Sequence, residues 1–160
     1  MNRMRARLDA LDTVSVMRLG LLTLAVGAVV VTAAELAFLQ HWDGTLQLLP
    51  WVALIAAAVG VLLLIIRPSH MGVWVARVLG AICLVLGGVG VYFHVLSNYD
   101  AGILDFRYTA AWPTMTDLDR WWLAATGGVG PTPPLAAASL SFAALLVLLA
   151  SVRASSPRDA

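Results

Sequence analysis

Four long apolar runs, separated by shorter polar stretches, dominate the sequence. A helix needs about 20 residues to cross a hydrocarbon core of roughly 30 Å, and these runs reach or approach that length. Each run is continuous and lacks the alternating pattern of membrane β-strands. The pattern therefore predicts an all-α membrane protein, a four-transmembrane-helix bundle forming a single domain over residues 16–152, with spans at residues 16–39, 48–66, 73–96 and 135–152.

The connection between the last two runs, residues 97–134, is too long for a tight turn and predicts structure of its own. Thr116 followed by Asp119 has capping-box spacing, and Leu118, Trp121 and Trp122 then share one helical stripe. We expect a short interfacial helix over residues 116–126, lying at the outer membrane surface. Tryptophans favour the headgroup level, which makes interfacial anchors of Trp42, Trp112, Trp121 and Trp122.

Arginines are unevenly distributed between the connections. They gather before the first span, around the second connection and after the last span, at residues Arg3, Arg5, Arg7, Arg18, Arg67, Arg77, Arg153 and Arg158. The positive-inside bias therefore places both termini in the cytoplasm, with a basic N-terminus (residues 1–15) and a tail (residues 153–160). The connections at 40–47 and 97–134 then lie outside the cell.

The first span has an alternative interpretation as a secretory signal peptide. Its N-terminal arginines, its apolar core and the small residues Ala33 and Ala34 fit a signal with a cleavage site. The apolar run continues past this site to Leu39, which favours a membrane span. Cleavage would leave the orientation of the other three spans unchanged.

Composition narrows the class of protein. The chain has 160 residues, 61% of them hydrophobic and 12% charged, with a net charge of +1. Ten arginines and no lysine suggest a GC-rich bacterial gene, hence the bacterial inner membrane. The single Cys83 excludes an internal disulfide and a CxxC redox pair. No nucleotide loop, HExxH or GxSxG motif is present, which favours a role other than that of an enzyme, with the lipid bilayer rather than nucleic acid as partner.

Candidate chemistry is concentrated at the external end of the predicted bundle. Glu35 and His94 should lie at similar depth, with Asn98 one turn above His94 and His41 at the edge of the first external connection. A charged, unpaired glutamate inside a membrane costs several kcal/mol, so Glu35 needs a partner or a wet cavity. We expect Glu35 and His94 to meet in a polar pocket covered by the 97–134 connection.

Several uses of this pocket are compatible with the residues. Glu35, His94 and Asn98 could bind a small ligand or relay protons. Glu35, His94 and His41 offer the mixed nitrogen and oxygen donors that suit a divalent transition metal. A haem held by His41 and His94, or a quinone, are further alternatives. The pair could also be purely structural, a Glu–His hydrogen bond that fixes helix register.

The sequence supports two functional hypotheses. The first is a metal- or small-ligand-binding module built on the Glu/His pocket. The second is a non-catalytic accessory or assembly subunit, whose small-residue helix faces and tryptophan-bearing external loop would contact a membrane-protein partner or a second copy of the chain.

Overall fold

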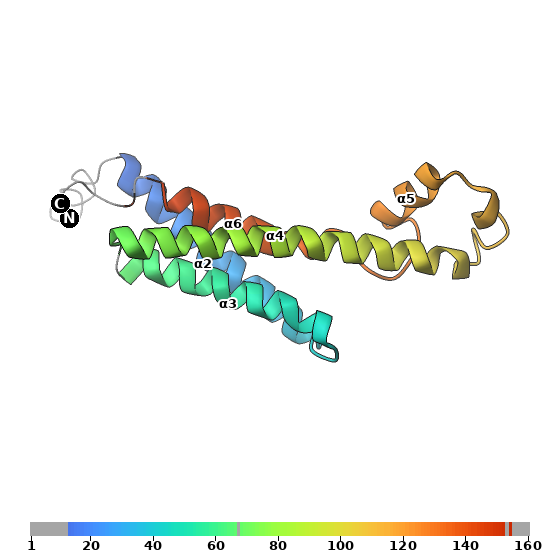
Figure 1. Cartoon of the computed structure of the whole chain (residues 1–160), viewed down its shortest axis with the longest axis horizontal. Coiled ribbons are helices and arrows are strands. Elements are labelled where there is room, and N and C mark those ends of the chain that lie inside the picture. The colour runs from blue at the N-terminus through green and yellow to red at the C-terminus, as the bar shows by residue number, and fades with distance from the viewer. Residues whose placement is uncertain (1–12, 67, 153, 155–160) are drawn as a thin grey trace, which may run out of the picture.

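The computed structural model describes residues 13–66, 68–152 and 154, and the regular secondary structure in this part of the chain is entirely helical. The elements are α2 (Thr13–Phe38), α3 (Thr45–Ile66), α4 (His70–Ala101), η1 (Gly102–Leu104), η2 (Trp112–Thr114), α5 (Asp117–Ala125) and α6 (Ala138–Ala150). Helices α2, α3, α4 and α6 lie side by side (Figure 1). The all-helical prediction is confirmed. The predicted N-terminal region (1–15) and tail (153–160) fall almost wholly outside the described residues.

Three of these helices, α2, α3 and α4, are long and apolar enough to cross a membrane. The fourth predicted span corresponds to α6, which has 13 residues. At 1.5 Å per residue α6 is about 20 Å long, short of the roughly 30 Å of a hydrocarbon core. Residues 134–137, after the proline-rich stretch, form turns, so the helix begins three residues later than predicted. The fourth span therefore stays a prediction.

Helix α4 is much longer than its apolar run. Ser69 caps its first turn by accepting a hydrogen bond from the backbone N–H of Gly72 (3.2 Å), and the helix continues for 32 residues, about 48 Å. Its C-terminal part extends beyond the other long helices, and α5 folds back along it (Figure 1). The sequence predicted only the apolar part, 73–96. Residues 97–101 are polar but remain helical, because the connection packs against them.

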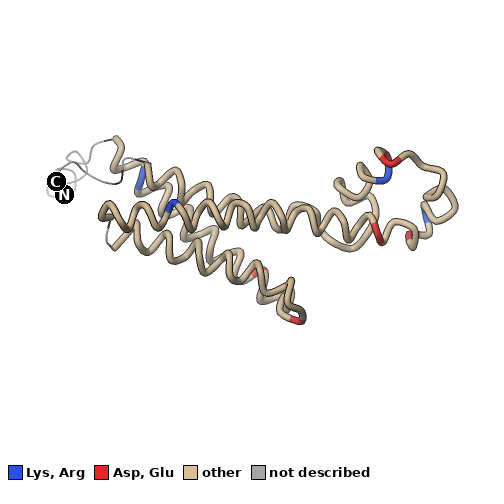
Figure 2. The backbone as a smooth tube through the Cα atoms, viewed as in Figure 1, with Lys and Arg blue, Asp and Glu red and all other residues tan. Residues whose placement is uncertain are grey.

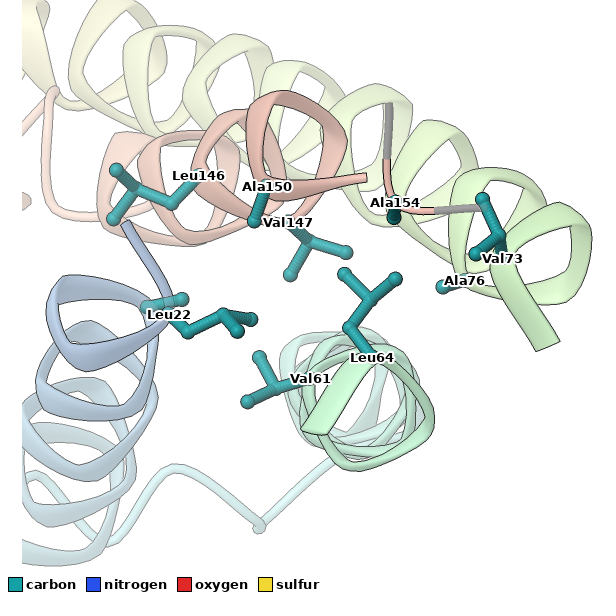
Figure 3. Packing of buried hydrophobic residues seen from close by; sticks show 10 residues of the cluster. Leu22, Val61, Leu64, Val73, Ala76, Leu146, Val147, Ala150 and Ala154 are labelled. Atoms are coloured by element: carbon teal, nitrogen blue, oxygen red, sulfur yellow. The ribbon is translucent and has the colours of Figure 1, made fainter. Parts of the chain in front are cut away.

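The bundle is held by interlocking apolar side chains and by close helix crossings. Leu22 of α2, Val61 and Leu64 of α3, and Val147 of α6 converge on one buried cluster (Figure 3). Small residues, all of them buried, let the helix backbones approach closely: Ala53, Ala57, Gly60, Ala76 and Gly80. The small-residue spacing visible in α3 and in the first half of α4 thus reports on packing.

Two arginines stabilise one end of the bundle, which we call the arginine end. Arg18 of α2 donates to the carbonyl of Leu64 near the C-terminus of α3 (2.8 Å). Arg77 of α4 donates to the hydroxyl and the carbonyl of Ser151 after α6 (3.0 and 2.9 Å). Cations at helix C-termini satisfy carbonyls that lack a helical partner and interact favourably with the helix dipole. Long uncharged stretches separate the charged positions along the helices (Figure 2).

The outer faces of the long helices are apolar. Helix α2 has only three buried residues; its exposed side chains include Val31 and Phe38, and Leu39, the residue after its end, is also exposed. A water-soluble protein rarely exposes contiguous apolar surface on this scale. A helix that is hydrophobic all round is suited to lipid. The arrangement is that of a membrane-spanning protein.

Candidate functional site

The turn that follows α2 sets the position of His41. Gln40 adopts a left-handed conformation (φ 50°), and the N–H of His41 bonds to the carbonyl of Leu36 (2.9 Å). Together with the bond from Gln40 N–H to the Ala37 carbonyl (3.0 Å), this is a Schellman motif. The indole N–H of Trp51 in α3 then donates to the carbonyl of His41 (2.8 Å). The backbone of His41 is thus tied to both α2 and α3.

His94 of α4 has a different partner from the one expected. Its Nδ1 lies 2.8 Å from the carbonyl oxygen of Pro133. A carbonyl can only accept, so Nδ1 carries the proton, and in the neutral ring Nε2 keeps its lone pair. Pro133 and Pro134 have no backbone N–H with which to form regular structure, and the ring of His94 donates to this irregular segment instead.

Asn98, one turn beyond His94, holds the same segment. Its side chain is fully buried (0% exposed). The amide nitrogen donates to the carbonyls of Thr132 (2.7 Å) and Ala124 (3.2 Å), and the amide oxygen accepts from the N–H of Thr132 (3.0 Å). Gly130 (φ +76°) packs directly on Asn98, with no room for a side chain. These contacts favour a structural role for Asn98, and its predicted role in ligand binding or proton relay stays a prediction.

Glu35 lies near both histidines but does not pair with them. It is exposed on α2, and its carboxylate makes no hydrogen bond or ion pair with any other residue that the structure describes. Glu35, His41 and His94 all line one small cavity of about 40 Å³. The expected direct Glu35–His94 contact is therefore not formed, because the Nδ1 of His94 is bonded to Pro133 and the exposed carboxylate can stay hydrated.

The same arrangement bears on the metal hypothesis. Over residues 13–66, 68–152 and 154, no three His, Cys, Asp or Glu side chains are grouped closely enough to hold a metal ion. The predicted metal ligands are Glu35, His41 and His94. They line one cavity, but they are not close enough together to coordinate one ion. The structure gives a metal site there no support.

A larger groove lies beside this cavity, between α3 and α4. We call it the α3–α4 groove, and its volume is about 490 Å³. It lies where the start of α3 diverges from α4 (Figure 1). Its apolar wall includes Leu49, Pro50, Leu86, Val89, Phe93 and Leu140. Its polar lining consists of His41, Gln47, His94, Ser97, Asp100 and Thr132. The groove therefore has an amphipathic lining with both histidines in it.

The electrostatics of the groove are set by His41 and Asp100. Partial burial lowers the pKa of His41, and the neighbouring His94 lowers it further. Because an unperturbed histidine titrates near 6.5, His41 is mainly uncharged at neutral pH. Asp100 is exposed, and its carboxylate forms no ion pair or hydrogen bond with another described residue.

The 97–134 connection covers the groove less than expected. Ser97, Asp100 and Thr132 line it, but α5 and residues 102–131 do not. These residues pack instead around the far end of α4, where the indole of Trp112 lies against Gly102 and contacts the ring of Tyr99 edge-on (5.6 Å between centroids). Trp112 is only 5% exposed and belongs to the buried core of this connection; its predicted role as an interfacial anchor stays a prediction, which this burial disfavours.

The short helix predicted within the connection is present as α5. Thr116 caps it by accepting a hydrogen bond from the N–H of Asp119 (3.2 Å). Trp121 stacks on Tyr99 of α4 (4.6 Å between centroids), which fixes α5 against the longer helix. Trp42 and Trp122 have exposed rings. A position of α5 in the membrane interface, and of Trp42, Trp121 and Trp122 as anchors, stays a prediction.

Four polar groove residues were not among the predicted site residues: Gln47, Ser97, Asp100 and Thr132. The signal for Asp100 is its spacing from Phe93 and Ser97, seven and three residues earlier, which places all three on one helix face. That face is visible only if α4 is continued past residue 96. Gln47 lies next to the apolar run of α3, and its amide oxygen accepts from the N–H of Asp43 (2.9 Å).

No protein-family model, no curated protein and no solved structure matches this chain. The geometry of the groove is therefore the basis on which a function can be argued.

Proposed function

We propose that the chain is a small integral protein of the bacterial inner membrane that binds a small ligand in the α3–α4 groove. The observation that carries this proposal is a groove of about 490 Å³ that joins an apolar wall to His41 and His94. Small-molecule sites typically have volumes of 300–1,000 Å³, with mainly apolar walls and a few convergent polar groups. An organic ligand fits this lining better than a bare metal ion does.

The position of the groove favours a ligand that comes from the bilayer. It lies where the apolar helices α2 and α3 meet at their turn and where α4 becomes polar. The arginines at the opposite end favour a cytoplasmic location for that end and for both termini. The groove then faces the extracytoplasmic boundary of the membrane. There a ligand can keep its apolar part in lipid and its polar part near water.

The histidines give the groove its chemical character. His94 is oriented by its bond to Pro133 and presents Nε2, while His41 is anchored through Trp51. Glu35 adds a carboxylate to the adjoining cavity of about 40 Å³. This volume exceeds the 10–15 Å³ or so that a water molecule needs, so a water-mediated link between Glu35 and His94 is compatible with the cavity. A proton relay between these two residues belongs to the same proposal.

Filling the groove should prevent binding. Leu49 lines the groove, whereas its neighbour Leu48 does not. In Leu49→Trp the indole should occupy the space needed by the ligand, and we expect labelling by a photoreactive long-chain alcohol in phosphatidylcholine nanodiscs to fall about tenfold, the effect of roughly 1.4 kcal/mol. Leu48→Trp is the matched control and should label like the wild type. Equal labelling of the groove peptides in both variants would contradict the proposal.

A second function, that of an accessory subunit, is favoured by apolar side chains that the chain leaves uncovered. Leu104, Phe106, Leu118 and Trp122 lie at the far end of α4 or in the connection and are 68–90% exposed. Exposed apolar groups outside the long helices are typical of contacts with another protein.

The accessory function can be separated from ligand binding. We expect Trp122→Glu to abolish co-purification of a partner, or of a second copy, from native membranes in a mild detergent. Leu49→Trp should leave that assembly intact. A wild-type protein that elutes as a lone monomer under the same conditions would argue against an accessory role.

A further inference from the structure

The polar end of the α3–α4 groove is rich in hydrogen-bond acceptors. His94 donates through Nδ1 to Pro133, which leaves Nε2 as an acceptor in the neutral ring. Asp100 adds a carboxylate that bonds to no other residue that the structure describes. Both residues line the groove. A ligand headgroup that meets them must therefore supply the donors.

The backbone adds a further acceptor. Pro50 lies inside α3 and has no N–H, so the carbonyl of Leu46, four residues earlier, lacks its usual helical donor. Leu46 and Pro50 both line the groove. In a membrane, a carbonyl left free by a proline is tolerated where a neighbouring group or ligand can satisfy it.

The charge of the groove disfavours an anionic headgroup. Among the described residues that line the groove, Asp100 is the one Asp, Glu or Arg side chain, so none of them is an arginine that could balance an anion. His41 is mainly uncharged at neutral pH because of its partial burial. A phosphate or sulfate headgroup would therefore lie beside a carboxylate with no cation to offset the repulsion.

We infer that the groove takes a membrane amphiphile whose headgroup donates hydrogen bonds and carries no negative charge. This inference rests on the proposed function and specifies the ligand class. The headgroup donates a hydrogen bond to Nε2 of His94, and a headgroup with a second N–H or O–H, as in a hydroquinone or an ammonium, also donates to the carboxylate of Asp100. The tail follows the apolar wall, where Leu49, Val89 and Phe93 are each partly exposed and leave the groove open along the helices.

Two chemical sources share this donor character: a neutral hydroxyl, as in a phenol or hydroquinone ring, and a primary ammonium, as in an aminolipid. Both can donate to an imidazole nitrogen and to a carboxylate. The methyl ether of the same phenol has nearly the same shape but no donor, and an alkyl sulfate has a negative charge.

The test uses four photoreactive probes with an identical diazirine-bearing alkyl chain and these four headgroups. The full chain is reconstituted in phosphatidylcholine nanodiscs, because the choline headgroup has no N–H or O–H donor. After irradiation and peptic digestion, mass spectrometry measures labelling of residues 46–50 and 86–97. We expect the phenol to label these peptides about tenfold more than its methyl ether, the effect of one well-placed hydrogen bond.

Each outcome decides a separate point. Phenol and ether labelling the groove equally would overturn the donor inference but leave groove binding intact. Groove labelling by the sulfate as strong as that by the phenol would overturn the charge argument. Labelling spread evenly over lipid-facing residues, with no preference for the groove, would overturn the proposed function as well. A preference for the ammonium over the phenol would support the inference and identify the amine as the source.

Two variants of His94 separate its ligand contact from its structural bond. In His94→Asn, the amide can replace Nδ1 as a donor to Pro133 but offers nothing at the position of Nε2. In His94→Gln, the amide reaches the position of Nε2 but loses the bond to Pro133. The inference predicts that His94→Asn stays folded and loses the phenol preference, whereas Asp100→Asn lowers labelling of the groove by the ammonium probe. A His94→Asn protein with an unchanged phenol-to-ether ratio would exclude Nε2 as the acceptor.

Discussion

Replacing Asn98 by alanine should release the connection between α4 and α6 while the bundle stays helical. The substitution removes three hydrogen bonds at a side chain that is 0% exposed. It leaves the carbonyls of Ala124 and Thr132 and the N–H of Thr132 without their partner. Each unsatisfied buried group costs about 1–3 kcal/mol, so we expect a loss of roughly 3–5 kcal/mol. Few other polar contacts join the connection to α4.

Limited proteolysis is the direct measurement of this effect. Cleavage within residues 102–131 should become rapid in Asn98→Ala, and the near-ultraviolet circular dichroism of the packed Trp112 and Tyr99 rings should weaken. Ser97→Ala is the matched control, since the neighbouring Ser97 is exposed and the one hydrogen bond between its side chain and another described residue, from the Thr132 hydroxyl, is long (3.4 Å). A resistant connection in Asn98→Ala would mean that the contacts of Trp112 suffice to hold it.

The long helices could be predicted from the sequence because lipid imposes a simple requirement. In hydrocarbon every backbone polar group must be satisfied within the helix, so a continuous apolar run of about 20 residues leaves few alternatives. The predicted spans 16–39 and 48–66 agree with α2 and α3 to within three residues at each end. The requirement ends at the membrane boundary. For this reason the polar extension of α4 through residue 101 could not be read from hydropathy.

The partner of His94 could not be predicted, because depth does not determine direction. Glu35 and His94 do lie at similar levels and line one cavity. The rotation of each helix about its axis is set by packing, here by the close approach of α4 to the start of α6. That rotation brings His94 to Pro133. A proline-rich segment, which cannot form regular secondary structure, is the signal that a nearby side-chain donor will bond to its carbonyls.

The sequence could not decide whether Trp112 lies at the membrane interface or in a protein core. A tryptophan suits both a membrane interface and a small protein core, since its ring is amphipathic. What decides between them is the space opposite the ring. Gly102, ten residues earlier, provides that space, because a side chain there would clash with the indole. The pairing of a glycine with a distant tryptophan is not visible as a local pattern.

Replacing Gly87 by alanine should separate α4 from α6, whereas the same change at the adjacent Gly88 should be tolerated. An added Cβ at Gly87 would overlap the hydroxyl of Ser141 and lie 2.8 Å from its backbone nitrogen. A side-chain oxygen can rotate away, but a backbone nitrogen moves only with its helix. The bond from the Ser141 hydroxyl to the Leu84 carbonyl (3.3 Å) would also be lost. Overpacking of this kind costs about 1–3 kcal/mol.

Gly88 is the matched control for Gly87, because a Cβ at Gly88 would meet nothing within 4 Å. Alanine is the better helix former by about 1 kcal/mol in water, so Gly88→Ala should be neutral or slightly stabilising. Thermal unfolding in detergent can be followed by the helical circular dichroism signal. The changes in melting temperature caused by the two substitutions should have opposite signs or clearly unequal sizes. Equal shifts would mean that α6 can move to accommodate a methyl group. The groove would then have a movable wall, because Leu140 of α6, next to Ser141, lines it.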